Sequence, residues 1–370
     1  MKYGGALPDR LITELVENGF IENANVKNVC TDTYDPVTTG EVYRLPRGFL
    51  PNRNERIGDF VHNYGIRVKP DSILEAGVCY IFRLAEKFVQ KIPDGVHAHA
   101  NPKSNIGRVD ILSRLLADGV PKFNFVPRGY TGLLWNMVEA RSFAVIANEG
   151  MSFSQIRFFN QETRLDELRL GTIFNSQGGM LFDRHGGQIL YEDMESPSED
   201  GSIPLSLGLD FSVVGFEAIK NGEPINLSLA NHYDPRCFFR EIFLSNDSSI
   251  NFNPNSFSIL STEESVRVLP TLACEMIPMD EGNGEIRVHY AGYIAPGWGV
   301  GPDGTGKGRP LTLEVRCFES GFMARRGQPF AKIYFDRMIE RPLIHYDQQP
   351  GTKFKVQDGP GLAKYFKSWK

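Results

Sequence analysis

Segment 101–108, with the sequence NPKSNIGR, has the residue types of an anion-binding site. A hydroxyl, small residues and two cations stand at the start of a predicted helix, where exposed backbone N–H groups favour phosphate oxygens. Ser104 can donate a further hydrogen bond, and Arg108 can bind phosphate through two parallel bonds. A helix-capping serine beside two solvated cations would show the same pattern, so the segment alone leaves both interpretations open.

A carboxylate, Glu314, lies in the predicted strand 310–315 (PLTLEV). Alternation along a strand would place Thr312 and Glu314 on one face and the apolar residues on the other. Burial favours the protonated form of a carboxyl group, which suits a base that takes up a proton and later returns it. An exposed glutamate, or an ion pair with Arg316 or Arg287, would fit the same pattern.

Two further motifs are candidate ligand sites. The glycine-rich segment 299–308 loosely matches two phosphate-binding patterns, but Gly308 stands where the Walker pattern needs Ser or Thr, so we interpret the segment as a hairpin loop. His97 and His99 would share a strand face, yet no third metal ligand is near them in the sequence and no Cys-x-x-Cys occurs. We therefore predict no metal site, and the motifs of a zinc nucleobase deaminase are absent.

The two halves of the chain share a repeated pattern. Segment 129–143 (GYTGLLWNMVEARSF) returns, with an insertion, within 297–318, and each copy runs into a glycine and an apolar strand. Such self-similarity predicts a duplicated domain. The repeat makes Glu139 the echo of Glu314 and a possible second-site residue. Because only the first half carries 101–108, we expect one site assembled from both halves.

The surrounding pattern predicts mainly β structure. Short apolar runs with alternating polarity are separated by Asp, Pro and Gly, and helical patterns are few, the clearest being 9–19 and 108–119. The acidic stretch 192–201 has almost nothing to bury and is the predicted linker. It divides the chain into 1–191 and 202–370, each large enough to bury a core.

Composition narrows the class of protein. The 370 residues have a net charge of −5, which disfavours general nucleic-acid binding, and no apolar window approaches a membrane span. The five scattered cysteines and an N-terminus without an apolar core favour a reducing cytoplasm. We expect a small-molecule partner, no nucleic acid and no membrane.

These motifs resemble those of the dCTP deaminases, trimeric relatives of dUTPase that deaminate without a metal. The family's phosphate motif Arg-Ser-Ser-x-Ala-Arg is similar to the segment from Lys103 to Arg108, which keeps the first Ser and the last Arg. Its Ala-x-x-Ile-Asp-Pro-Gly-Trp stretch is similar to the segment from Ala291 to Trp298, AGYIAPGW. The first motif therefore lies in one half of the chain and the second in the other.

The catalytic and tail motifs of the family also have counterparts. Its Val-Leu-Glu, which carries the catalytic glutamate, resembles Thr312-Leu-Glu314. Its tail, in which a Tyr, a Lys and a Gln close over the nucleotide, is matched by Tyr346, Lys353 and Gln357. The resemblance therefore implies that Glu314 is the catalytic residue and that the tail forms a lid.

The resemblance implies a fold, a reaction and a set of partners. The fold would be a tandem duplicate of a dUTPase-like distorted β-barrel or jelly-roll domain with a few short helices, as in the long, duplicated bacterial branch. The reaction would be hydrolytic deamination of dCTP to dUTP and ammonia, with no tightly bound cofactor and with Mg²⁺ accompanying the triphosphate. The resemblance further implies a homo-oligomer and makes dTTP a candidate inhibitor. The implied substrate-binding residues are Lys103, Ser104, Asn105, Arg108, Ala291, Trp298, Thr312, Tyr346, Lys353 and Gln357.

One position departs from the pyrophosphate-releasing relatives. They need an aspartate just before Pro-Gly, where this chain has Ala295. Deamination alone is therefore expected, and dUTP pyrophosphatase or a bifunctional enzyme is the alternative within the fold. An alternative of another class is a non-catalytic nucleotide-sensing module, which would tolerate Gln in place of Glu314.

Overall fold

The computed structural model describes residues 4–93, 95–175, 178–194, 200–279, 286–288, 291–318, 321–350 and 357–369. The chain forms two compact units. The first consists of Met1–Glu162, Lys220–Cys237 and Ala363–Lys370, and the second of Thr163–Ile219 and Phe238–Leu362. This division differs from the expected 1–191 and 202–370, because residues 163–191 belong to the second unit, and residues 220–237 and 363–370 belong to the first. Part of the predicted linker 192–201 lies outside the described residues.

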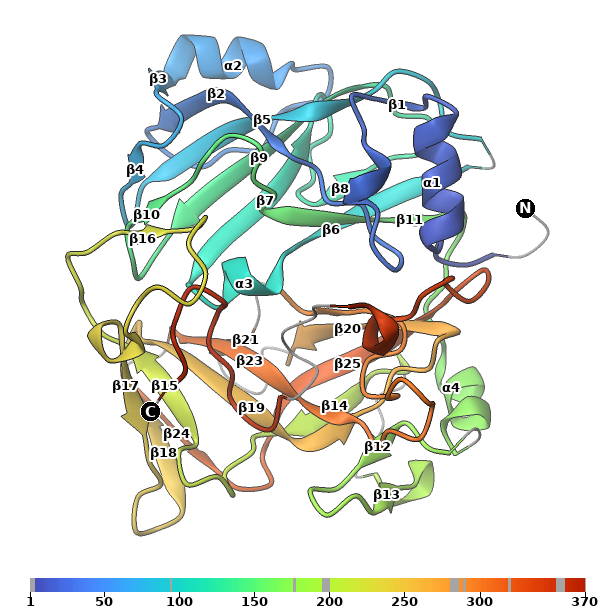
Figure 1. Cartoon of the computed structure of the whole chain (residues 1–370), viewed down its shortest axis with the longest axis vertical. Coiled ribbons are helices and arrows are strands. Elements are labelled where there is room, and N and C mark those ends of the chain that lie inside the picture. The colour runs from blue at the N-terminus through green and yellow to red at the C-terminus, as the bar shows by residue number, and fades with distance from the viewer. Residues whose placement is uncertain are drawn as a thin grey trace. The chain divides into compact units, whose positions relative to one another are not determined.

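The first unit is built mainly from antiparallel strands (Figure 1). Its helices are α1 (Asp9–Glu17), α2 (Ile57–Tyr64) and α3 (Ser104–Gly107), with short 3-10 turns at Val26–Asn28 and Pro235–Cys237. Its strands are β1 (Ile21–Glu22), β2 (Thr38–Leu45), β3 (Ile66–Val68), β4 (Ile73–Leu74), β5 (Cys79–Phe88), β6 (His97–Pro102), β7 (Ile111–Ala117), β8 (Phe125–Val126), β9 (Gly132–Ala140), β10 (Val145–Ile146), β11 (Ser154–Phe159) and β16 (Ile225–Asn226). The main sheet has the order β3-β2-β5-β9-β7, with β1 also paired to β5, and a second sheet has the order β11-β6-β8.

The second unit also consists mainly of strands (Figure 1). It contains α4 (Glu167–Phe174) and short 3-10 turns at Tyr191–Asp193 and Tyr346–Gln348. Its strands are β12 (Leu181–Phe182), β13 (Gln188–Ile189), β14 (Ile203–Ser206), β15 (Gly215–Ala218), β17 (Phe239–Ile242), β18 (Ser249–Phe252), β19 (Phe257–Val266), β20 (Leu272–Pro278), β21 (Ile286–Val288), β22 (Tyr293–Ile294), β23 (Arg309–Cys317), β24 (Phe322–Arg325) and β25 (Pro329–Arg337). One sheet runs β13-β12-β19-β15-β17 with β23 on β19 and β21 on β23, and another runs β14-β25-β20-β22. The predicted mainly β fold with a few short helices is confirmed.

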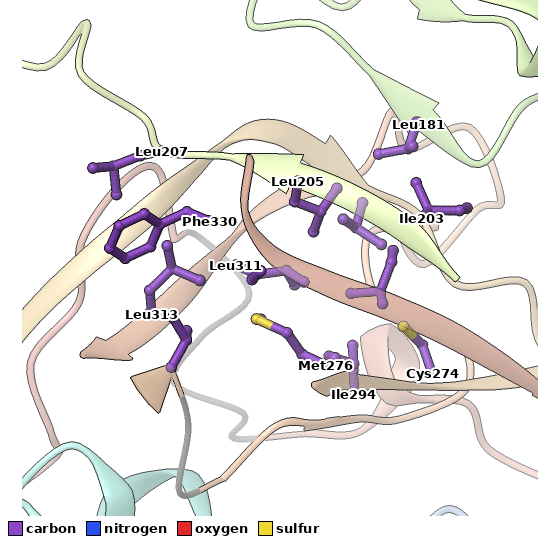
Figure 2. Close-up of a cluster of buried hydrophobic side chains, with 14 of the residues drawn as sticks. Leu181, Ile203, Leu205, Leu207, Cys274, Met276, Ile294, Leu311, Leu313 and Phe330 are labelled. Carbon is purple, nitrogen blue, oxygen red and sulfur yellow. The ribbon is translucent and has the colours of Figure 1, made fainter. Parts of the chain in front are cut away.

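The core of the second unit lies between strands that include β23. Figure 2 shows Leu205 from β14, Met276 from β20 and Phe330 from β25 gathered around Leu311 and Leu313 of β23, and all five are almost completely buried. Each such side chain stabilises the fold by about 1.5–3 kcal/mol on burial. The alternation predicted for segment 310–315 is therefore used to anchor β23 in the core.

Strand pairings recur in the two units. In the first unit β9 lies between β5 and β7, and in the second β23 lies between β19 and β21, with every pairing antiparallel. The β5–β9 ladder is interrupted between Arg83 and Lys87, and the β19–β23 ladder between Ser261 and Ser265. Because such an irregularity marks one defined place in a ladder, β5 can be matched to β19 and β9 to β23 residue by residue.

One of the two expected helices forms. The pattern 9–19 is α1, which ends before Gly19 in the left-handed region at φ 70°. The pattern 108–119 was interpreted wrongly, because it contains strand β7, and helix is confined to the single turn of α3. Apolar residues that suit a helix also suit a strand covered on both faces, and the ladder with β9 decides between them. Among the described residues, the helices are all too short or too polar to cross a membrane.

Candidate active site

Glu314 is buried in the second unit. Its exposed fraction is 2%, and the Oε2 atom accepts a hydrogen bond of 3.0 Å from the backbone N–H of Ala291. Its neighbours on β23, Leu313 and Val315, are completely buried in the core. The structure thus brings together the glutamate and the alanine that the sequence motifs singled out, and it rules out the exposed-glutamate alternative.

Thr312 lies two residues before Glu314 on the same strand and is half-buried. Its Oγ1 atom is shielded from solvent and has no hydrogen-bond partner among the residues that the structure describes. A buried hydroxyl usually has a partner, so an unsatisfied one close to a carboxylate can accept or donate a bond to a bound molecule. Thr312 and Glu314 therefore supply complementary polar groups to one stretch of β23.

The Pro-Gly-Trp turn and the start of the tail also meet. The rings of Trp298 and Tyr346 lie 5.2 Å apart between centroids with an interplanar angle of 48°. The backbone N–H of Tyr346 donates a 2.9 Å hydrogen bond to the carbonyl of Pro296. Trp298 is 6% exposed, and its Nε1 has no partner among the described residues. The two aromatic residues that the resemblance singled out thus contact each other.

Of the two remaining tail residues, the structure describes Gln357 but not Lys353. Gln357 donates from Nε2 to the carbonyl of Pro310, 3.2 Å away, at the start of β23. Lys353 lies outside the described residues. The glycine-rich segment 299–308 is a loop that folds back on itself, since Gly308 N–H donates to the Gly299 carbonyl at 2.9 Å. It connects β22 and β23, which belong to different sheets, so it does not join two paired strands as the predicted hairpin loop would. Ala291, Trp298, Thr312, Glu314, Tyr346 and Gln357 all belong to the second unit.

The phosphate-type segment belongs to the first unit. It begins a helix as expected, but α3 is only four residues long. Arg108 directly follows α3 and is 5% exposed. Asn105 accepts, through its Oδ1 atom, a 2.8 Å hydrogen bond from the backbone N–H of Lys364, so the end of the chain is attached to this helix. The amide NH₂ of Asn105, rather than its oxygen, is therefore the group suited to meet an anion.

Asp35 is a partner that sequence reasoning missed. Its carboxylate forms an ion pair with the ammonium group of Lys103, and it accepts a bond from the thiol of Cys30 at 3.7 Å. Burial, together with Asp35, raises the pKa of Cys30 to about 12, so this cysteine is a neutral thiol and not a nucleophile at neutral pH. Asp35 and Lys103 are separated by 68 positions in the sequence, so local patterns do not reveal the pair.

Glu139 does not have the surroundings of Glu314. Its side chain is about one-third exposed and forms a 3.0 Å ion pair with Arg141. It lies opposite Cys79 in the ladder between β5 and β9. Glu139 is therefore a surface carboxylate held by a neighbour along the chain.

The strand register matches Glu314 to a first-unit residue other than Glu139. Met137 lies opposite Ile81, two residues before the interruption in the β5–β9 ladder, and Glu314 lies opposite Ile259, two residues before the interruption in the β19–β23 ladder. Met137 therefore occupies in the first unit the place of Glu314 in the second. The suggestion that Glu139 is the repeat of Glu314 is wrong, because the sequence comparison was displaced by two residues.

His97 and His99 share one face of β6, as expected. Their ring centroids lie 5.5 Å apart, and both rings pack against Phe159 at 5.6 Å. Burial, followed by the charges of Arg128 and Lys122, lowers the pKa of His97, so its ring is neutral at neutral pH. Within the part of the chain that the structure describes, His, Cys, Asp and Glu nowhere form a group of three suited to a metal ion. These histidines belong to an aromatic cluster.

Comparisons with known proteins show the family of this chain. Two family models match the chain, namely the 2′-deoxycytidine 5′-triphosphate deaminase (DCD) N-terminal domain over residues 3–162 and the C-terminal domain of the same family over residues 179–366. A search of curated proteins found no match.

Solved structures were compared as well. A 2′-deoxycytidine 5′-triphosphate deaminase from Agrobacterium tumefaciens is similar, with a TM-score of 0.82 and 29% identity over 92% of this chain and 97% of that chain. A dUTPase of Staphylococcus bacteriophage 80alpha with dUPNHPP matches with a TM-score of only 0.21 and 7% identity over 32% of this chain and 81% of that chain. On the two family models and the Agrobacterium structure, this chain belongs to the 2′-deoxycytidine 5′-triphosphate deaminase family.

Proposed function

We propose that this protein hydrolyses the C4 amino group of dCTP, giving dUTP and ammonia. Family membership supports the substrate and the reaction. The observation that carries the proposal is the buried Glu314 carboxylate, which is oriented by the backbone N–H of Ala291 and lies beside the unsatisfied hydroxyl of Thr312.

Glu314 has the role of general base and then general acid. Its carboxylate takes a proton from water while the oxygen of that water bonds to C4 of the cytosine. The carboxyl group passes this proton to N3, takes the second proton from the new C4 hydroxyl and gives it to the amino group. The bond from C4 to the amino nitrogen then breaks, the C4 carbonyl forms and ammonia leaves. One water enters and one ammonia leaves, so Glu314 ends the cycle in its starting state.

The base pocket uses groups around Glu314. The N–H of Ala291 is already bonded to the carboxylate, so its carbonyl is the group suited to contact the edge of the base. Trp298 would form a wall of the pocket, and Tyr346 would close against it from the tail. Gln357 and Lys353 complete the proposed lid. Closure excludes water, which strengthens the polar contacts inside.

The triphosphate, bound as its Mg²⁺ complex, is assigned to the first unit's motif. Arg108 supplies a planar group that matches two phosphate oxygens, and Ser104 supplies a hydroxyl. Lys103 would exchange its partner Asp35 for phosphate when the substrate arrives. Asn105 would donate from its amide nitrogen.

We further propose that the product is dUTP and not dUMP. Cleavage of pyrophosphate needs an aspartate that orients water, and Ala295 stands at that position. Inhibition by dTTP and assembly of several chains are further proposals from the family resemblance, which dTTP titration and light scattering during size-exclusion chromatography would test.

The first experiment is incubation of the purified protein with dCTP and Mg²⁺, with and without a zinc chelator. Ammonia is measured, and the nucleotides are separated by ion-exchange chromatography. We expect ammonia and dUTP in equal amounts, unaffected by chelation. dUMP with pyrophosphate would show that the enzyme is bifunctional, and binding of dCTP without ammonia would identify a nucleotide sensor.

A further inference from the structure

Asp347, which is neither in the family motif nor among the proposed substrate ligands, is a buried carboxylate next to the tail residue Tyr346. It is 3% exposed and lies in the second unit. Its Oδ1 atom pairs with the guanidinium group of Arg309, and its Oδ2 atom accepts a 2.7 Å hydrogen bond from the backbone N–H of Gly301. One carboxylate therefore binds both the start of β23 and the glycine-rich loop.

Trp298 is contacted by both neighbours of this carboxylate. The guanidinium carbon of Arg309 lies 4.4 Å from the centroid of the Trp298 ring, close enough for a cation–π interaction. The ring of Tyr346, which precedes Asp347, lies 5.2 Å from the same tryptophan. Arg309 and Tyr346 are thus joined through Asp347 and both touch Trp298.

The glycine-rich loop is shaped to receive this carboxylate. Gly299 and Gly301 have φ values of 71° and 75°, a region that favours glycine. A cleft of about 520 Å³ lies beside the loop. Its lining residues are Gly299, Gly301, Pro302, Gly306, Gly308, Arg309, Asp347 and Gln348. The loop and the Arg309 and Asp347 pair therefore line the same cleft.

We propose that Asp347 and Arg309 are positioning residues for nucleotide binding, and that their ion pair holds Trp298 and Tyr346 in the geometry that closes over the base. This inference rests on the proposed function. A buried ion pair is expensive to desolvate and is weak evidence for stability, so a role in fixing geometry is the alternative reason for its presence. Arg309 also begins the strand that carries Glu314 five residues later, so the pair connects the tail to the catalytic strand.

The test uses Asp347→Asn, which keeps the shape of the side chain and an acceptor but removes the charge that Arg309 needs. We expect KM for dCTP to rise about tenfold, the size of one lost charged hydrogen bond, while kcat changes less than threefold. The matched control is Asp303→Asn, an exposed acid in the same loop whose carboxylate accepts hydrogen bonds from the nearby Thr305. The control should leave KM unchanged.

A second readout does not need turnover. In a Glu314→Gln background, Asp347→Asn should weaken dCTP binding about tenfold in equilibrium dialysis. Fluorescence of Trp298, identified by its loss in Trp298→Phe, should become more accessible to acrylamide in Asp347→Asn and not in Asp303→Asn. If the wild-type protein does not deaminate dCTP, the proposed function fails while these two measurements still decide on the pair.

A purely structural role would lower the melting temperature and the active fraction without changing KM. A folded Asp347→Asn with unchanged KM, unchanged dCTP affinity and unchanged quenching would overturn the proposal. If Asp347→Asn does not fold, Arg309→Lys replaces it, because it keeps the charge for Asp347 but lacks the planar group over Trp298. The same shifts in affinity and quenching are then expected, and their absence would equally overturn the proposal.

Discussion

Met137 and Glu314 stand at matched positions of two similarly paired strands, β9 and β23, in opposite environments. Glu314 is bonded to a backbone N–H beside an unsatisfied threonine hydroxyl. Met137 belongs to an apolar cluster with Trp135 and Tyr43. Gly48 also packs against it, since a Cβ atom on Gly48 would lie only 3.4 Å from the methyl group of Met137. The same strand pairing can therefore form either a chemical site or a filled core.

In the first unit, α2 and the residues just before it fill the space around Met137. Ile57 and Val61 of α2 are completely buried in the cluster of Met137. Phe49 and Phe60 pack against the same cluster with their rings stacked 3.7 Å apart. The first unit thus retains the phosphate-type segment but has apolar side chains where the second unit has its carboxylate. We therefore expect one catalytic centre per chain.

The largest expected effect comes from substituting Glu314, compared with a substitution of its counterpart Met137. Glu314→Gln should lower the rate of ammonia release by about 10²–10⁴-fold, the usual contribution of a general acid–base group. Met137→Leu conserves volume and should leave the rate within about twofold, at a cost in stability below about 1.5 kcal/mol. Single-turnover assays and thermal melts measure both. Equal losses of activity in the two variants would remove the distinction between the units.

The number of nucleotides bound sharpens the same comparison. The Glu314→Gln protein should bind one dCTP per chain in equilibrium dialysis, because the position of Met137 offers no carboxylate and its surroundings are filled. Two equivalent dCTP molecules per chain would show that the first unit also has a base pocket.

Arg108 should affect binding more than chemistry. Arg108→Ala removes the planar cation of the first unit's motif, and we expect KM for dCTP to rise about 10–100-fold with a smaller change in kcat. Discrimination between dCTP and dCMP should fall in parallel. Arg47→Ala, at an exposed arginine of the same unit, is the control and should change neither. Unaltered discrimination in Arg108→Ala would separate this segment from the phosphates.

A smaller effect on KM is expected from breaking the hydrogen bond between Asn105 and Lys364. Asn105 accepts the backbone N–H of Lys364, so Asn105→Ala loses both that anchor and an amide donor. We expect KM for dCTP to rise about threefold to tenfold. Lys364→Pro removes this N–H together with the lysine side chain, and Lys364→Ala is its control because it removes the side chain but keeps the N–H. A rise in KM for Pro but not for Ala would assign the effect to the anchor, and equal values in all three would contradict it.

The last comparison concerns stability and pH. Burial raises the pKa of Glu264 in the second unit to about 7, and burial also raises the pKa of the matched Glu86 in the first unit. A raised pKa means that the folded state binds more protons, so the free energy of unfolding should fall as pH rises from about 4.5 to about 7. For Glu264 the change is at most about 3 kcal/mol.

Glu264→Gln should flatten this dependence, which urea denaturation at a series of pH values would measure. Glu86→Gln should flatten it less, because Glu86 accepts a hydrogen bond from the Tyr34 hydroxyl in addition to a backbone N–H bond, here from Val37, of the kind that Glu264 accepts from Ser206. A wild-type protein that becomes more stable across this window would contradict the assignment to Glu264.

The sequence by itself determined the chemical groups of the candidate site. Glu314 beside Leu and Val, the Pro-Gly-Trp turn and the phosphate-type segment could be recognised because each is a local pattern of residue types. The mainly β class and helix α1 could also be predicted, since polarity alternation and helix boundaries are local properties. These predictions agree with the structure wherever hydrogen bonding within a few residues is enough to decide the conformation.

Only the tertiary structure decided the positions that depend on pairing across the chain. Segment 108–119 satisfies both helix and strand patterns, and β9 makes part of it a strand. Register matched Met137, and not Glu139, to Glu314, because only the pairing with the neighbouring strand fixes the position along the ladder, whereas residues two apart lie on the same face and look alike in the sequence pattern. Asp35 with Lys103, and Asp347 with Arg309, are ion pairs between residues far apart in sequence. Spacing along the chain carries no record of them, since folding alone brings such charges together.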